Sequence, residues 1–270
     1  MRTIAFVSDV HCGTMYSIMP ENFQLKEGNP LPLNDGQKLI LEYWESFWKE
    51  CDGENVDTVV WCSDLIHGQN PIERGTQLLT TDFNEQIRMF LELAKPKAIG
   101  RKNHFVSGSG YHRGVRGGSP DEVICNVINE MDNTEGIWHG PLALGPFEPS
   151  QKTFFISHGE SQAFIYRAQV IDRENLHMNA AIGLEKIPKI HAVINGHWHC
   201  SEYHMINRQH HIQVGCWCAF LPWRGSMKLY PRMQPDIGGT IVKITDDDEI
   251  IVKEYVYSPN PKICDYVRPL

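Results

Sequence analysis

The sequence predicts a mixed α/β domain whose C-terminal half is richer in strands than its N-terminal half. Three observations support this fold class. Short, continuous apolar runs end in polar residues, which is typical of strands buried on both faces of a sheet. Segments with helical periodicity lie between these runs. From about residue 190 onward, strand-like segments follow one another.

Five apolar runs are the strongest strand candidates. Each run stops at an acidic residue, a histidine or a glycine-rich segment, so its end is clearly marked. Uninterrupted runs of this length favour central strands over edge strands. The runs occupy residues 3–8, 57–63, 104–108, 152–157 and 191–195.

Two segments between the first strands have the spacing of amphipathic helices. In residues 37–51 and 82–95, apolar side chains recur at positions i, i+3, i+4 and i+7, so one side of each helix would face the core. Pro96 is expected to end the second helix, because proline lacks the N–H that a helix interior needs.

A capping box predicts the start of a third helix, with Ser119 at the N-cap, Pro120 at the first position and Glu122 at the third. Residues 160–186 are expected to be helical but interrupted. The strand-like segments of the C-terminal half are residues 201–206, 210–217, 239–245 and 249–257.

We expect a single domain that spans residues 1–270, because no repeat or low-complexity linker divides the chain. Residues 14–36 and 218–238 look like insertions. Both are rich in proline, methionine and aromatic residues, and we expect them to border a substrate cleft.

The composition is that of a globular protein with a substantial core, with 41% hydrophobic and 21% charged residues. A formal net charge of −8 argues against an extended basic surface for binding nucleic acid, because such binding needs clustered Lys and Arg. A local basic groove, or metal ions that meet the phosphates, is compatible with this charge.

Neither a membrane nor a secreted location is expected. No apolar run approaches the roughly 20 residues of a membrane helix, and the N-terminal run is too short for a signal peptide. The eight cysteines include no CxxC pair, so scattered reduced thiols are favoured over disulfides or a structural zinc site. We therefore expect a cytoplasmic protein.

Acidic and histidine side chains recur where the predicted strands end. A single such residue is often only a turn or cap residue, but recurrence after five strands favours a shared site. In α/β sheets, ligands bind outside the carboxyl ends of strands, where loops bring distant residues together. The residues are Asp9, His11, Asp64, His112, His158, His197 and His199.

These residue types suit a metal centre. Neutral imidazole and carboxylate are the ligands that Zn, Mn and Fe prefer, and three or four of them leave a position for water or substrate. One carboxylate can bridge two metals through its two oxygens. Two metals about 3.5–4 Å apart can clamp a phosphoryl group and generate hydroxide near neutral pH.

The motifs, taken in order, resemble the calcineurin-like metallophosphoesterase family. They are Asp-x-His, an Asp after a strand, a loop with Gly and His, a lone His, and Gly-His-x-His, spread over residues 6–199. The most specific are "DVH" at 9–11 and "GHWH" at 196–199. The resemblance implies a four-layer αββα sandwich, in which helices flank two mixed β-sheets.

The resemblance also implies a dinuclear site with two divalent metal ions, Mn, Fe or Zn, with manganese favoured. A hydroxide between the metals would attack phosphorus, and a nearby histidine would protonate the leaving oxygen. The implied ligands are Asp9, His11 and His199 for one ion, His158 and His197 for the other, and Asp64 between the two.

The third motif departs from the family pattern, which has Gly-Asn-His. Here the loop "SGSGYHRG" has Ser109 in place of the asparagine and a displaced His112, as in the Gly-Thr-x-x-His variant of phage-type members. Either Ser109 replaces the missing ligand, or His112 does, or the second site lacks one ligand. We favour His112 as the acid, with Ser109 and Arg113 at the substrate.

The other histidines carry less information. His67 occupies a position where the family often has an acidic residue, and it faces either the site or solvent. The rest have no supporting context and are expected to be structural or superficial. They are His139, His177, His191, His204, His210 and His211.

The sequence therefore predicts a metal-dependent phosphoesterase that acts on a monoester or diester, with a nucleotide or nucleic acid among the possible substrates. The alternative is a metal-binding scaffold of the same fold with weak or no turnover, because the asparagine is missing. A Ser-His-Asp hydrolase is disfavoured because no G-x-S-x-G motif is present.

Overall fold

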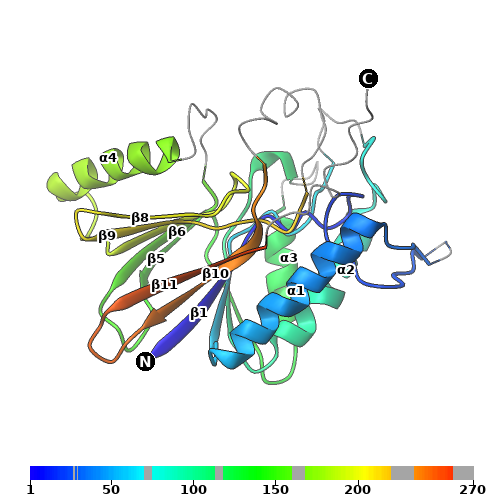
Figure 1. Ribbon diagram of the computed structural model, residues 1–270, viewed down its shortest axis with the longest axis horizontal. Coiled ribbons are helices and arrows are strands. Elements are labelled where there is room, and N and C mark those ends of the chain that lie inside the picture. Colours follow the sequence, from blue (N-terminus) through cyan, green and yellow to red (C-terminus); the bar gives the residue numbers. More distant parts are fainter. Residues whose placement is uncertain are drawn as a thin grey trace.

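The computed structural model describes residues 1–26, 28, 30–69, 75–112, 118–159, 168–219 and 234–257. Two mixed β-sheets stack face to face, with α-helices outside them (Figure 1). The mixed α/β class is confirmed, and the layering is consistent with the expected sandwich. Apolar side chains of both sheets, such as Phe6, Val60, Phe154 and Ile194, fill the space between them.

The first sheet has six strands in the order β11-β10-β1-β2-β3-β4. Strands β1 to β4 run parallel, whereas β10 runs antiparallel to both β1 and β11. The strands are β1 (Arg2–Val7), β2 (Thr58–Trp61), β3 (Lys102–Phe105), β4 (Glu135–Trp138), β10 (Ile237–Ile244) and β11 (Ile250–Tyr257).

The second sheet has five strands in the order β5-β6-β7-β9-β8. The central strands β6, β7 and β9 are parallel, and β5 and β8 are antiparallel edges. The strands are β5 (Leu142–Pro146), β6 (Thr153–Ser157), β7 (Ala192–Asn195), β8 (Glu202–Ile206) and β9 (Gln209–Gln213).

The described residues include four α-helices and one short 3₁₀ helix. Helices α1, α2 and α3 lie outside the six-stranded sheet, and α4 lies outside the five-stranded sheet (Figure 1). The helices are α1 (Asp35–Gly53), α2 (Phe83–Ala98), η1 (Gly110–His112), α3 (Pro120–Asn129) and α4 (Gln169–Gly183).

The predicted helices form, but two details of the sequence prediction are wrong. Helix α2 continues through Pro96 to Ala98, since a proline near the last turn removes only one hydrogen bond. Ser119 is the N-cap of α3, but its hydroxyl donates to Asp121 instead of capping the backbone.

The short strands β4 and β5 were not predicted, because neither contains a continuous apolar run.

The segments predicted to be insertions are only partly described. Within 14–36, Ile18, Met19 and Phe23 are buried in the same core cluster as Ile40 and Trp44 of α1. Most of 218–238, and the first part of the helix expected at 160–186, lie outside the described residues.

The seven cysteines within the described ranges are buried and form no disulfide with one another, and Cys264 lies outside those ranges. Among the helices described, none is long and apolar enough to cross a bilayer.

Candidate metal centre

The predicted site residues converge where strands of both sheets end. Asp9 and His11 follow β1, Asp64 follows β2, His158 follows β6, and the loop after β7 carries His197 and His199. Stacking the two sheets brings these carboxyl ends to one edge of the sandwich, where ligands of α/β proteins bind. All six residues that were predicted as metal ligands are thus neighbours in space.

The loops that carry these residues adopt an unusual backbone conformation. Six non-glycine residues have positive φ, a conformation that costs roughly 1 kcal/mol or more when it persists in a folded protein. Hydrogen bonds between the loops stabilise this backbone conformation. They run from Asp9 N to Ser63 O (3.0 Å) and from His11 N to Asp64 O (2.9 Å). The residues are Asp9, His11, Ser63, Asp64, His197 and His199.

Two glycines allow the loops to approach the carboxylates closely. A Cβ atom on Gly108 would lie 1.9 Å from Asp64 Oδ1, and one on Gly196 would lie 1.9 Å from Ser8 Oγ. Neither distance is possible without displacing a loop. The glycine of "GHWH" is therefore required by its contact with Ser8 and Asp9, which follow β1.

Asp9, His11 and His199, the Asp9 group, form one cluster. Nε2 of His11 lies 3.0 Å from Nε2 of His199, and Asp9 Oδ1 lies 3.6 Å and 3.3 Å from these two nitrogens. Asp9 Oδ2 accepts hydrogen bonds from Ser8 Oγ (2.5 Å) and His197 N (2.7 Å). Oδ1 accepts none within the described residues, so it is free to bind a cation.

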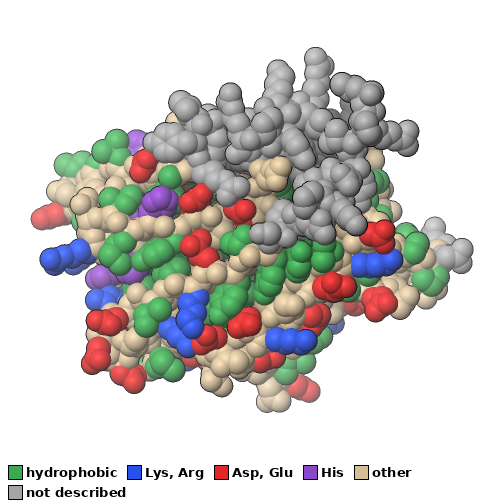
Figure 2. All heavy atoms as spheres, in the orientation of Figure 1, with side chains coloured by type: hydrophobic (Ala, Val, Ile, Leu, Met, Phe, Trp, Pro, Cys, Tyr) green, Lys and Arg blue, Asp and Glu red, His purple; other side chains and the backbone are tan. Residues whose placement is uncertain are grey.

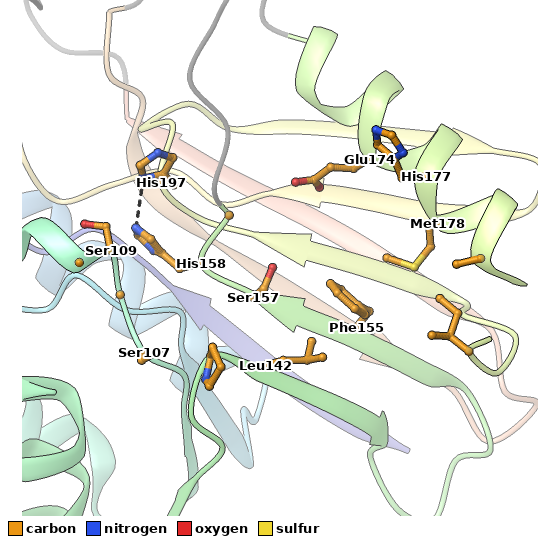
Figure 3. A pocket seen from close by; sticks show the side chains of 16 residues that line it. Ser107, Ser109, Leu142, Phe155, Ser157, His158, Glu174, His177, Met178 and His197 are labelled. Atoms are coloured by element: carbon orange, nitrogen blue, oxygen red, sulfur yellow. Dashed lines mark hydrogen bonds between the residues drawn. The ribbon is translucent and has the colours of Figure 1, made fainter. Parts of the chain in front are cut away.

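Asp64, His158 and His197, the Asp64 group, form the adjacent cluster. His158 Nε2 lies 2.8 Å from Asp64 Oδ2 and 3.3 Å from His197 Nδ1, and Figure 3 shows the two histidines facing each other. His158 Nδ1 donates to Cys62 O (3.1 Å), so Nε2 of the neutral ring carries the lone pair. This arrangement is typical of a metal-binding histidine.

The two groups share one electrostatic environment. Asp9 and Asp64 are 0% and 3% exposed. Burial raises the pKa of both carboxyl groups, but the surrounding histidines outweigh burial and hold both pKa values below the usual range. Two buried negative charges therefore persist side by side, and they require a compensating cation.

The histidines divide into neutral and charged members. Burial lowers the pKa of His11 to about 3 and that of His197 to about 4, so both rings are neutral at pH 7. Burial also lowers the pKa of His158, but Asp64 and Asp9 together raise it to about 10. A divalent ion at this position would take over the charge of His158 and release its proton.

Each group fits a divalent ion, because it offers one carboxylate and two imidazoles whose ligand atoms lie within 4.8 Å of one another. A third set with this spacing consists of His11, His67 and His112. His67 is 0% exposed, so the alternative that it faces solvent is wrong. The sequence did not indicate this third set, because His67 joins it only through tertiary contacts.

The loop that lacks the family asparagine supports Asp64 directly. Ser109 donates to Asp64 through its backbone N (3.0 Å, to Oδ1) and its hydroxyl (3.2 Å, to Oδ2). His112 donates from Nδ1 to the carbonyl of His67, and its Nε2 lies 3.5 Å from Asp64 Oδ2. Arg113, which was predicted to contact substrate, lies outside the described residues.

Sequence reasoning missed Asp121, a buried acid that links two loops of the site, those after β2 and β3. Its carboxylate accepts hydrogen bonds from Ser63 Oγ (2.9 Å), Gly108 N (3.1 Å) and Leu65 N (3.4 Å). Burial raises its pKa, and the charge of Asp64 raises it further. The only sequence signal was an acidic residue in the first turn of a helix next to the glycine-rich loop.

A cavity of about 940 Å³ adjoins the Asp64 group, between the five-stranded sheet and α4 (Figure 3). Glu174 of α4 lines this cavity and accepts a hydrogen bond from Asn195, which in turn accepts one from Ser157 (2.8 Å). Burial raises the pKa of Glu174 to about 7. His177 also lines the cavity, although it was expected to be structural or superficial.

Comparisons with known proteins find similarity only in structure. No protein-family model matches the chain, and no curated protein matches its sequence. Similar solved structures include a novel archaeal phosphodiesterase, at 17% identity over 94% of this chain and 99% of that one, with a TM-score of 0.47.

Two further similar structures have comparable coverage. Wild-type Vps29 from Entamoeba histolytica, complexed with zinc, is 12% identical over 94% of this chain and 98% of that one, with a TM-score of 0.43. A predicted phosphoesterase from Streptococcus pneumoniae is 13% identical over 95% and 98%, with a TM-score of 0.37. Because these TM-scores lie below 0.5, we base the functional assignment on the residues of the site.

Replacing Gly108 with alanine is expected to lower the metal affinity of the Asp64 group by about 10-fold or more, because the added Cβ would displace Asp64 or the loop. Isothermal titration with Mn²⁺ measures this effect. Gly110→Ala is the matched control, since a Cβ there meets no atom within 4 Å. Equal affinities for the two variants would contradict the role given to Gly108.

Glu174→Gln is expected to stabilise the protein at pH 8 but not at pH 4.5. Because the folded pKa of about 7 lies above the ordinary value of 4.5, the stability of the wild type should fall as pH rises through this interval. The difference should reach about 1–3 kcal/mol at pH 8, and glutamine can still accept the hydrogen bond from Asn195. Urea unfolding at both pH values tests this, and a pH-independent difference would contradict it.

Proposed function

We propose that the protein is a dinuclear metal-dependent phosphoesterase. One observation carries this proposal: two sets of one carboxylate and two imidazoles, the Asp9 group and the Asp64 group, lie side by side in a buried site. His158 belongs to the second set, yet its Nε2 lies only 4.0 Å from Asp9 Oδ1. Two adjacent sets of this kind suit a pair of ions that act on one phosphoryl group.

In this proposal, Asp9, His11 and His199 would hold one ion, His158 and His197 would hold the other, and Asp64 would be available to both. Two bound ions would supply Lewis acidity toward the phosphoryl oxygens and would activate the attacking water. Manganese is the favoured ion, with iron and zinc as alternatives, because imidazole and carboxylate ligands suit all three.

The protein's own side chains orient this chemistry. Ser8 Oγ and His197 N fix one oxygen of Asp9, and both donors of Ser109 fix Asp64. The hydrogen bond from His112 Nδ1 to the carbonyl of His67 leaves Nε2 of His112 directed toward Asp64. When the ring is charged, Nε2 carries the second proton, and we assign to it the protonation of the leaving oxygen.

The face shown in Figure 2 favours a small substrate over a long nucleic-acid duplex. On the face shown in Figure 2, the Lys and Arg side chains of the described residues are interspersed with Asp and Glu. A duplex needs clustered basic residues. A phosphomonoester or a small phosphodiester, nucleotides included, agrees better with this surface and with the net charge of −8.

One observation favours a second candidate, a metal-binding scaffold without turnover. The hydroxyl of Ser109, which stands where the family has a metal-binding asparagine, donates to Asp64, so in this candidate it holds that carboxylate and does not bind the ion. The Asp64 group would then hold its ion with one ligand fewer. Hydrolysis assays on the metal-loaded protein separate the two candidates.

The wild type loaded with Mn²⁺ is expected to hydrolyse p-nitrophenyl phosphate or bis-p-nitrophenyl phosphate. Asp64→Asn should lower kcat by more than about 100-fold, since even the loss of a partner outside the ligand shell costs 10–100-fold. Asp132→Asn is the matched control, because Asp132 is exposed in the turn that follows α3. Metal-loaded wild type that is no more active than Asp64→Asn would favour the scaffold.

His112→Ala is expected to slow esters of alkyl alcohols by about 100-fold but esters of p-nitrophenol much less, because a good leaving group needs no proton. Elemental analysis should find the same metal content as in the wild type. Loss of metal would make His112 a ligand instead of an acid, and equal loss of rate for both leaving groups would contradict the acid role.

A further inference from the structure

The cavity beside the Asp64 group is larger than a phosphoryl group requires. Its volume of about 940 Å³ lies at the upper end of the range for sites that bind organic ligands. His158, His197 and Ser109 line it, so it is continuous with the proposed metal centre. A phosphate ester bound at the metals would therefore place one of its alcohol groups in this cavity.

The chemistry of the cavity changes along its length (Figure 3). The end near the metals is polar. The other end is lined by apolar side chains from β5, β6, α4 and the segment after α4, and several of them pack into a small apolar cluster. These side chains are Leu142, Phe155, Met178, Ala181 and Ile187.

The polar groups that line the cavity disfavour a second negative charge in the ligand. Among the described residues that line it, none is lysine or arginine. Glu174 projects into it from α4, and its carboxylate already accepts a hydrogen bond from Asn195. A second phosphate in the cavity would meet this carboxyl group with the imidazole of His177 nearby but no lysine or arginine to balance its charge, so an uncharged group fits better.

We propose that this cavity binds the alcohol part of the substrate, and that it selects phosphate esters whose alcohol carries an uncharged, apolar group of ring size. This inference rests on the proposed function, and it adds the substrate class. Phe155 and Met178 contact the apolar group, and the phosphoryl group stays at His158 and His197. Esters of small or charged alcohols leave the apolar end of the cavity unused.

The test compares the binding of naphthylmethylphosphonate and methylphosphonate to the Mn²⁺-loaded protein by isothermal titration. Both ligands carry the same phosphonate, so their affinity difference reports on the cavity. The wild type should bind naphthylmethylphosphonate at least 10-fold more tightly. Ala181→Trp, which fills the apolar end, should remove this difference and leave methylphosphonate binding unchanged.

Ala180→Trp is the matched control, because Ala180 is the exposed neighbour of Ala181 on α4 and does not line the cavity. It should keep the 10-fold preference. If Ala181→Trp does not fold, Leu142→Glu replaces it, since Leu142 is 38% exposed on an edge strand and its replacement adds a charge to the apolar end. Equal affinities for the two phosphonates in the wild type, or equal loss in both tryptophan variants, would overturn the inference.

Hydrolysis separates this inference from the proposed function. p-Nitrophenyl naphthylmethyl phosphate and p-nitrophenyl methyl phosphate release the same alcohol, so their kcat/KM ratio reports on the other ester group. A ratio of at least 10 in the wild type, lost in Ala181→Trp, supports the inference. If neither of these diesters nor p-nitrophenyl phosphate is hydrolysed but the phosphonate preference persists, the proposed function fails and the cavity assignment stands.

Discussion

The structure depends on a pair of carboxylates, Asp9 and Asp64, buried where the two β-sheets meet. Water does not solvate them, so their negative charge must be balanced within the protein or by a bound cation. The surrounding histidines provide part of this balance, and His158 lies within 4.0 Å of both carboxylates. A site of this kind is costly without a cation, which is the physical reason to assign metal binding to it.

The sandwich architecture explains how residues so far apart in the chain meet. The first sheet contributes the loops after β1, β2 and β3, and the second contributes those after β6 and β7. Glycines at 108 and 196 allow these loops to approach within contact of the carboxylates. The positive φ angles at six site residues persist because hydrogen bonds between neighbouring loops hold them.

The sequence predicted the mixed α/β class and the residues at strand ends, because apolar runs and the polar residues that stop them are local signals. It did not indicate Asp121, the burial of His67 or the role of Glu174, since each depends on contacts between segments distant in the chain. Strands β4 and β5 were not predicted for a related reason. They are defined by their pairing with β3 and β6, and their own sequences contain no long apolar run. The sequence also left Ser109 and His112 as alternatives, whereas the structure directs the hydroxyl of Ser109 to Asp64.

The central claim is that this site holds two metal ions, one in each carboxylate–imidazole group. Anomalous scattering from crystals grown with Mn²⁺ tests it most directly, because it locates each ion. We predict two peaks, one among Asp9, His11 and His199 and the other among Asp64, His158 and His197. The absence of any peak, or a single ion bound by His11, His67 and His112, would contradict the account.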